Sequence, residues 1–216
     1  MVLPYIPEHL FELNSNLFPQ FDGEVIIIDN LFKNYSYILD VCTNMPVEIW
    51  KSSPTSRNFK DYFDCRPIID NHCPDKKMLD KRLSTFRSLI SNFFKTTKKL
   101  DIDKWFVFNY FKHLKKDIPN NIQLHPHYDH YFNVITYIDP FENGGTAIYE
   151  NQNIDLKEEE NVLYDISKLK IKKIIPSKPN RCIIFPGNLL HGGYIKNHNV
   201  YHYNWRINLV NFILEK

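Results

Sequence analysis

The spacing of hydrophobic residues divides the chain into a helical first part and a strand-rich second part. Between positions 75 and 98, apolar residues recur every three or four positions with basic residues between them. This spacing predicts an amphipathic helix that packs against a sheet. A shorter helix is expected over 34–43, with Asn34 as its N-cap and Pro46 closing it. The aperiodic segment 1–23 is expected to be an arm that lies over the domain.

Short runs of β-branched and aromatic residues, separated by turn signals, predict about eight strands. The clearest strands cover 24–29, 105–111, 133–138, 146–149, 171–175, 181–185 and 205–214. Helices followed by many short strands favour a mainly β fold with supporting helices, namely a double-stranded β-helix, or jelly roll, of the cupin kind. The aperiodic segments 51–73 and 151–170 are expected to shape a substrate entrance.

The length and charge of the chain limit its organisation and its partners. Its 216 residues suit one domain, in which 1–104 supplies the arm, the first strand and the helices, and 105–214 forms the jelly-roll core. The formal charge of +2 argues against a nucleic-acid partner. We expect a cytoplasmic protein without a membrane partner, because no apolar run is long enough to cross a bilayer and no secretory signal pattern is present. The four cysteines lack C-x-x-C spacing, so free thiols are expected.

The segment 124–130 concentrates three histidines and an aspartate. If it is extended, His127 and Asp129 share one face, because alternate residues of a strand point to the same side. Such a pair, joined by a distant second histidine, is the ligand set of non-haem Fe(II) oxygenases, which leaves positions open for a co-substrate and dioxygen. His125 and His130 are expected to lie beside these ligands or to face the substrate.

The third ligand must come from another strand, and three histidines are candidates. His191 is favoured because it follows a predicted buried strand and precedes two glycines, which let a backbone run close to a metal. His198 and His202 lie in a polar segment and are expected to be surface residues.

Arg206 stands in an otherwise apolar final strand. A buried guanidinium needs a partner, because an unpaired buried charge is very costly, and its planar fork matches a carboxylate. Two partners are open at this point. One is an internal aspartate or glutamate, and the other is the distal carboxylate of a keto-diacid that chelates the metal.

The order of these motifs resembles the Fe(II)/2-oxoglutarate-dependent oxygenases, in particular their prolyl-hydroxylase-like branch. The resemblance covers roughly residues 105–212, and its motifs are Tyr110, His127-Tyr128-Asp129, Tyr137-Ile138-Asp139, Gly144-Gly145-Thr146, the strand 180–185, His191 and Arg206. The chain departs from collagen-type prolyl hydroxylases, which have a lysine closer to the distal histidine. A collagen-like proline is therefore not implied as the substrate.

The resemblance implies that His127, Asp129 and His191 bind Fe(II) and that 2-oxoglutarate and dioxygen are co-substrates. It implies hydroxylation of a C–H bond of a peptide residue or a small metabolite, with release of succinate and carbon dioxide.

The resemblance also assigns residues to the co-substrate. Arg206 would bind the C5 carboxylate, Tyr137 would donate to it, and Tyr110 would line the pocket. Asn208 is added because it shares a strand face with Arg206. Two other interpretations stay open. A cupin-type metal protein that does not use 2-oxoglutarate would not need Arg206, and a non-catalytic jelly-roll binding module would need no metal.

Overall fold

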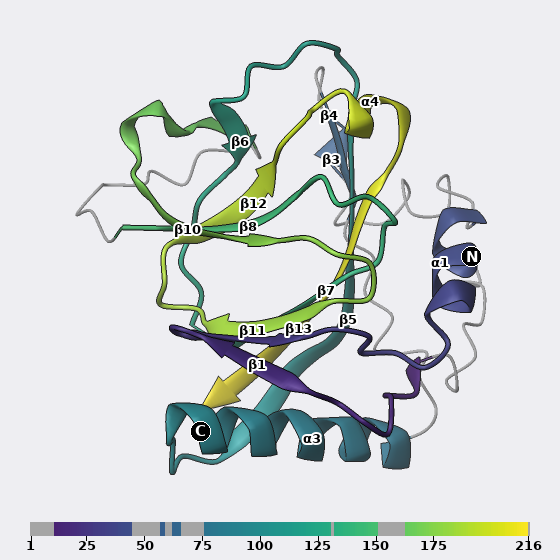
Figure 1. Ribbon diagram of the computed structural model, residues 1–216, viewed down its shortest axis with the longest axis vertical. Helices are drawn as coiled ribbons and strands as arrows, with labels where there is room; N and C mark the ends of the chain where they lie inside the picture. The colour runs from purple at the N-terminus through teal and green to yellow at the C-terminus, as the bar shows by residue number, and fades with distance from the viewer. Residues whose placement is uncertain are drawn as a thin grey trace.

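The computed structural model of the chain consists of two β-sheets that face each other, with helices outside the larger one (Figure 1). It describes residues 11–44, 57–58, 62–65, 76–130, 132–150 and 163–215. In this part of the chain, eight strands form the larger sheet, three form the smaller sheet, and two more pair with each other. The predicted mainly β, double-stranded β-helix fold is confirmed.

Neighbouring strands are antiparallel in all three sheets. From edge to edge, the larger sheet contains β1 (Pro19–Asp22), β2 (Val25–Ile28), β11 (Cys182–Pro186), β7 (Phe132–Tyr137), β13 (Arg206–Glu215), β5 (Leu100–His113), β4 (Tyr62–Cys65) and β3 (Arg57–Asn58). The smaller sheet contains β10 (Ile171–Pro176), β8 (Gly144–Tyr149) and β12 (His191–Ile195). The remaining pair is β6 (Ile122–Leu124) and β9 (Leu163–Asp165).

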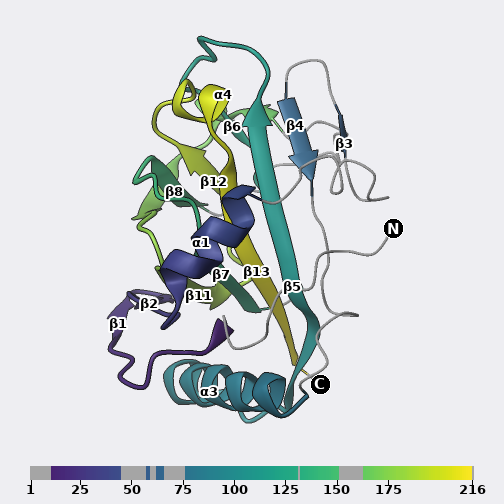
Figure 2. The ribbon, with the colours of Figure 1, turned by 90° about the vertical axis from the view of Figure 1, so that its right-hand side faces the viewer.

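The two longer helices, α1 and α3, lie on one side of the larger sheet (Figure 2). The described helices are α1 (Tyr35–Asn44), α3 (Lys76–Phe94), the short α4 (Val200–Tyr203) and the 3-10 turn η3 (Ile166–Lys168). Ile38 of α1 and Ile90 of α3 are buried in one core with Ile207 and Leu209 of β13. Burying each such side chain contributes about 1.5–3 kcal/mol.

The opposite face of the larger sheet looks toward the smaller sheet. A second core lies between the two sheets and includes Ile148 and Ile175 from the smaller sheet and Ile183 and Phe185 from β11. Because alternate strand residues point to opposite faces, the residues of β13 that flank Ile207 point into this interior rather than toward the helices. The fold thereby places polar residues of β13 between the two sheets.

The first strand departs from the prediction. Residues 19–22 belong to the predicted arm, but they form β1, which pairs with β2 across a turn at Gly23. Gly23 has a φ of +62°, a conformation that glycine adopts without steric cost. β1 is an edge strand with mostly exposed side chains, so it has no apolar alternation for a hydrophobic pattern to detect.

The predicted loop 51–73 contains β3 and β4 in its described part. The rest of that loop, Pro46 and residues 151–162 lie outside the described residues. The division of the chain into 1–104 and 105–214 stays a prediction. Among the described residues, no helix is long and apolar enough to cross a membrane.

Candidate functional site

Three side chains that can bind a metal converge near the start of β12. His127, Asp129 and His191 each offer one ligand atom, and these atoms lie within 4.8 Å of one another. Oδ2 of Asp129 is 3.7 Å from Nε2 of His127 and 3.4 Å from Nε2 of His191. Two imidazoles and one carboxylate form the donor set of a non-haem Fe(II) site, so the residues present fit such a metal.

Backbone hydrogen bonds hold the two histidines opposite each other. His127 and His191 form an isolated antiparallel bridge, in which each backbone N–H donates to the other residue's carbonyl, at 2.8 and 3.1 Å. The backbone N–H of Asp129 donates to the carbonyl of Gly187 at 2.7 Å. The segment 124–130 is therefore fastened to His191 and to Gly187 before it, which fixes the separation of the ligands.

The other ring nitrogen of each histidine faces a backbone carbonyl. Nδ1 of His127 lies 3.0 Å from the carbonyl oxygen of His125, and Nδ1 of His191 lies 2.8 Å from that of Leu189. A carbonyl only accepts, so each Nδ1 carries a proton, and in the neutral ring Nε2 keeps its lone pair. This is the tautomer in which a metal-binding histidine is usually held.

The carboxylate of Asp129 is suited to bind a cation. Burial raises the pKa of Asp129. The contacts with His191 and His127 and a hydrogen bond from Asn133 together lower this pKa by more than burial raises it, so it lies below its ordinary value. Asp129 is therefore ionised at neutral pH, as metal binding requires.

Asn133 is a buried polar residue of β7 that the sequence pattern does not single out. Its Nδ2 donates to Oδ2 of Asp129 at 2.9 Å and lies 3.2 Å from Nε2 of His191. In the sequence it is only the first residue of an apolar strand. Its isolated polarity among buried neighbours is the one signal that marks it.

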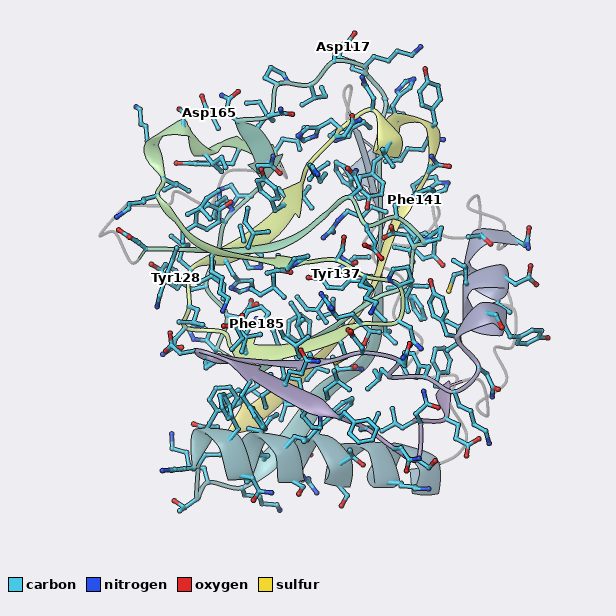
Figure 3. The ribbon with its side chains drawn as sticks, viewed as in Figure 1. Asp117, Tyr128, Tyr137, Phe141, Asp165 and Phe185 are labelled. Carbon is cyan, nitrogen blue, oxygen red and sulfur yellow. The ribbon has the colours of Figure 1, made fainter. Side chains whose placement is uncertain are left out.

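The three ligands differ in exposure, which shows where the site opens. The side chain of His127 is 53% exposed, that of Asp129 20% and that of His191 4%. Tyr128 and His130 beside them are exposed as well. Figure 3 shows Tyr128 toward the edge of the molecule and Tyr137 in the interior between the sheets. The site is open on the His127 side and closed on the His191 side.

A second polar cluster surrounds the guanidinium of Arg206 inside the barrel. Arg206 is buried, and its Nη2 donates to the carbonyl of Gly145 at 3.3 Å. With the amide of Asn208 oriented so that its oxygen faces the guanidinium, that oxygen accepts from Nη1 at 2.7 Å and from Nη2 at 3.1 Å. The hydroxyls of Tyr137 and Thr146 are 2.8 Å apart. Thr146, which belongs to this cluster, is the last residue of the Gly144-Gly145-Thr146 motif.

No carboxylate of the described residues forms an ion pair with Arg206. Asp139 is buried nearby, and its carboxylate accepts hydrogen bonds from the hydroxyl of Tyr201 and the backbone N–H of Ile207, both at 3.1 Å. Burial raises the pKa of Asp139 although the charge of Arg206 acts to lower it. The sequence left two possible partners for Arg206, an internal carboxylate and the carboxylate of a ligand. Asp139, the internal carboxylate nearby, is not in ion-pair contact with Arg206.

Gly193 packs closely against the guanidinium of Arg206. A Cβ atom on Gly193 would come within 2.5 Å of Cδ1 of Leu124 and 3.2 Å of Nη2 of Arg206. Any side chain at this position would therefore crowd Leu124 and the guanidinium. The residues around Arg206 fit the distal end of a keto-diacid.

No family model and no curated protein matches the sequence. Solved structures do match its fold. An oxidoreductase of the 2OG-Fe(II) oxygenase family from Burkholderia pseudomallei has a TM-score of 0.50 and 13% identity, over 89% of this chain and 85% of its own. The epimerase SnoN, in complex with Fe3+, alpha ketoglutarate and nogalamycin RO, has a TM-score of 0.50 and 11% identity, over 89% and 79%. The chain has the fold of these enzymes.

Tyr110 does not join the polar cluster. It pairs with Ile207 across β5 and β13, whereas Arg206 pairs with Phe111, so Tyr110 points to the helix-covered face of the sheet. There its hydroxyl donates to the carbonyl of Cys42 in α1 at 3.4 Å. Its assignment to the co-substrate pocket stays a prediction that this placement does not support.

Of the remaining histidines, His125 is half-buried, with its ring edge-on to Tyr164 at 5.1 Å between centroids. The expectation that His198 is a surface residue is wrong. His198 is buried, with Nδ1 2.7 Å from Nε2 of His113, because the segment after β12 folds back onto the end of β5. His202 is half-buried in α4. Neither His198 nor His202 joins the metal-binding group.

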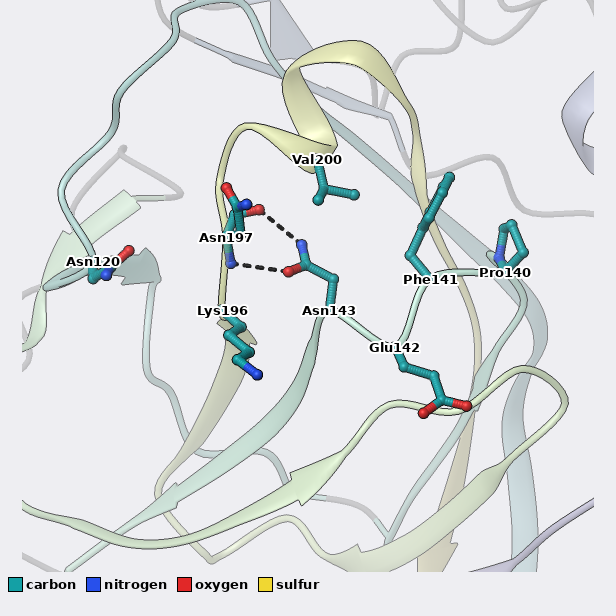
Figure 4. Close-up of a pocket in the computed structure, with 8 residues that line it drawn as sticks. All are labelled: Asn120, Pro140, Phe141, Glu142, Asn143, Lys196, Asn197 and Val200. Carbon is teal, nitrogen blue, oxygen red and sulfur yellow. Dashed lines mark hydrogen bonds between the residues drawn. The ribbon is translucent and has the colours of Figure 1, made fainter.

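A separate cavity of about 670 Å³ lies at the far end of β8 and β12. Figure 4 shows the residues that line it. Its lining residues are Asn120, Pro140, Phe141, Glu142, Asn143, Lys196, Asn197 and Val200. Ile195 pairs with Gly144 near this cavity, whereas His191 pairs with Ile148 at the other end of the two strands. The amide of Asn143 both donates to and accepts from the backbone of Asn197, at 2.8 and 2.9 Å. The cavity is therefore distinct from the metal-binding group.

Proposed function

We propose that the protein is an Fe(II)- and 2-oxoglutarate-dependent dioxygenase that hydroxylates a C–H bond of a peptide residue or a small metabolite. The observation that carries this proposal is the state of Arg206. It is buried, it has no carboxylate of the described residues in ion-pair contact, and it shares the barrel with the metal-binding group. A buried guanidinium of this kind is completed by an anionic ligand, and a metal-chelating diacid would reach both clusters.

In this proposal His127, Asp129 and His191 hold the iron through their Nε2 atoms and the ionised carboxylate. The carbonyls of His125 and Leu189 keep the imidazoles in the required tautomer and orientation. When bound, iron, 2-oxoglutarate and dioxygen supply the oxidising chemistry, with release of succinate and carbon dioxide.

The co-substrate's distal carboxylate would lie against Arg206. The side chain of Asn208 and the carbonyl of Gly145 each accept hydrogen bonds from the guanidinium of Arg206. The remaining N–H groups of Arg206 can then donate to the ligand. Burial raises the pKa of Tyr137 to about 12, so its hydroxyl keeps its proton and can donate. Thr146 orients that hydroxyl. The substrate would approach on the open His127 side.

Production of succinate tests the function. Purified protein supplied with Fe(II), 2-oxoglutarate and dioxygen is expected to form succinate, slowly even without substrate. His127→Ala should abolish both succinate formation and stoichiometric metal binding, because it removes one of three ligands. Metal binding by the wild-type protein without any succinate would favour the cupin-type alternative, and the absence of stoichiometric metal would favour a binding module.

The role of Arg206 has its own test. Arg206→Gln should raise the KM for 2-oxoglutarate at least tenfold, because it removes a charge-assisted bidentate contact. Arg87→Gln is a matched control, since Arg87 lies on α3 outside the barrel and its side chain is partly exposed. An unchanged KM in Arg206→Gln would remove Arg206 from the assignment while leaving the metal site in place.

A further inference from the structure

Asn133 contacts two of the three proposed iron ligands with one atom. Its Nδ2 lies 2.9 Å from Oδ2 of Asp129 and 3.2 Å from Nε2 of His191. An amide nitrogen carries two hydrogens, so it can serve both contacts. Nδ1 of His191 faces the carbonyl of Leu189, so in the neutral ring Nε2 is the acceptor and the atom that would bind a metal. One N–H of Asn133 therefore faces the aspartate and the other faces the histidine.

A metal ion on Nε2 of His191 would displace one of these two contacts. Nε2 of His191 has a single lone pair, and a metal ion bound there uses it. The carboxylate of Asp129 has about four acceptor positions, so its hydrogen bond with Asn133 can persist beside a metal bond. Asn133 is buried, and water cannot readily replace the lost acceptor. Metal binding thus leaves one amide N–H without a partner next to the ligands.

The position of Asn133 relative to the Arg206 cluster indicates what this N–H would meet. Asn133 and Tyr137 lie on the same face of β7, four residues apart, which is about 13 Å along a strand. Tyr137 and Thr146 mark the end where the distal carboxylate is proposed to bind. Asn133 marks the metal end. A metal-chelating 2-oxo acid would place its own carboxylate there, and a carboxylate accepts strongly from an amide N–H.

We propose that Asn133 braces Asp129 with one N–H and, with the N–H that faces His191, donates to the metal-chelating carboxylate of the co-substrate. This inference rests on the proposed function. It makes Asn133 a co-substrate-binding residue as well as a brace for Asp129. A residue that only braced Asp129 would affect metal binding alone.

The test separates metal affinity from co-substrate affinity. Asn133→Leu removes both N–H groups and keeps a side chain of similar volume. If the leucine variant does not fold, Asn133→Ala also removes both N–H groups, with a smaller, unbranched side chain. Without dioxygen, so that no turnover occurs, Mn²⁺ is titrated calorimetrically into metal-free protein, and 2-oxoglutarate is then titrated into the Mn²⁺-saturated protein. We expect each affinity to fall about tenfold in the variant, the size typical for groups that hydrogen-bond to metal ligands.

Asn211→Leu is the matched control. Asn211 is also a buried asparagine, and it lies on the adjacent strand β13 opposite Val134. Its substitution should change neither affinity. If Asn133→Leu weakens Mn²⁺ binding but leaves 2-oxoglutarate affinity unchanged, Asn133 is only a brace and the inference is wrong. If wild-type protein saturated with Mn²⁺ does not bind 2-oxoglutarate, the proposed function itself fails, so the two failures are distinguishable.

Discussion

Two buried tyrosines show how a single position in a strand decides a residue's role. Tyr137 and Tyr110 are equally buried, but Tyr137 faces the barrel interior with Thr146, whereas Tyr110 faces the helices. Tyr137→Phe should raise the KM for 2-oxoglutarate about three- to tenfold, because it removes one hydrogen bond to a charged group. Tyr110→Phe should leave that KM unchanged. Steady-state succinate assays on both variants check this, and an equal effect in the two would contradict the assignment.

Gly193 gives a second prediction for a single residue. An added methyl group would crowd Leu124, whose flexible side chain can move, and would approach the guanidinium of Arg206. Gly193→Ala should therefore reduce 2-oxoglutarate affinity several-fold without changing Mn²⁺ affinity. Gly192→Ala is the contrasting variant, since its Cβ would meet the backbone carbonyl of Leu124 at 2.9 Å and should lower thermal stability instead. Calorimetry and thermal unfolding of both proteins distinguish the two effects.

The residues that sequence alone identifies are those whose chemistry is local. His127 and Asp129 are two positions apart, and His191 is marked by its glycines. The predicted role of Tyr110 is not supported by its placement, because its face depends on the register between β5 and β13, which no local pattern fixes. Asn133 and Thr146 gain meaning only from side chains far away in the sequence, so local periodicity cannot find them.

At the scale of elements, the hydrophobic pattern identifies the strands of the core and misses the elements that have no apolar pattern. β7, β11 and β13 are buried on both faces and stand out as apolar runs. β12 is not recognisable because it begins His-Gly-Gly, although it carries a proposed metal ligand. α4 is too short and too polar for a periodic signal. β12 forms because the neighbouring strand β8 provides its hydrogen-bond partners, which is tertiary information.

The connection between β10 and β11 depends on one asparagine. Asn180 has a φ of +60°, and its side chain accepts from the backbone N–H of Phe32 at 2.8 Å and donates to that residue's carbonyl at 2.9 Å. Asn180→Ala should lower the free energy of unfolding by about 2–4 kcal/mol, because two buried backbone groups lose partners and alanine tolerates a positive φ poorly. Urea denaturation measures this. Asn92→Ala, at an exposed position of α3, should change stability by less than about 0.5 kcal/mol.

At the scale of the molecule, the buried histidine pair predicts how stability depends on pH. Burial lowers the pKa of His113 to about 3, with smaller contributions from His198 and His202, and burial lowers the pKa of His198 to about 4. Both rings are therefore neutral in the folded protein, whereas in the unfolded chain they take up protons near pH 6.5. Below that pH the unfolded state binds more protons, so this part of the stability is fully present above pH 6.5 and is lost as pH falls toward 4.

The urea midpoint should consequently fall between pH 7.5 and pH 5, the range in which the histidines of the unfolded chain become protonated. The pair contributes to this fall because both rings are buried and in contact, with Nδ1 of His198 2.7 Å from Nε2 of His113. The double variant His113→Asn, His198→Gln removes both titrating groups and should show a clearly smaller fall, even if its midpoint at pH 7.5 is lower. His130→Asn, at an exposed position, should retain the wild-type fall. An equal fall in the double variant would show that other groups govern the acid sensitivity.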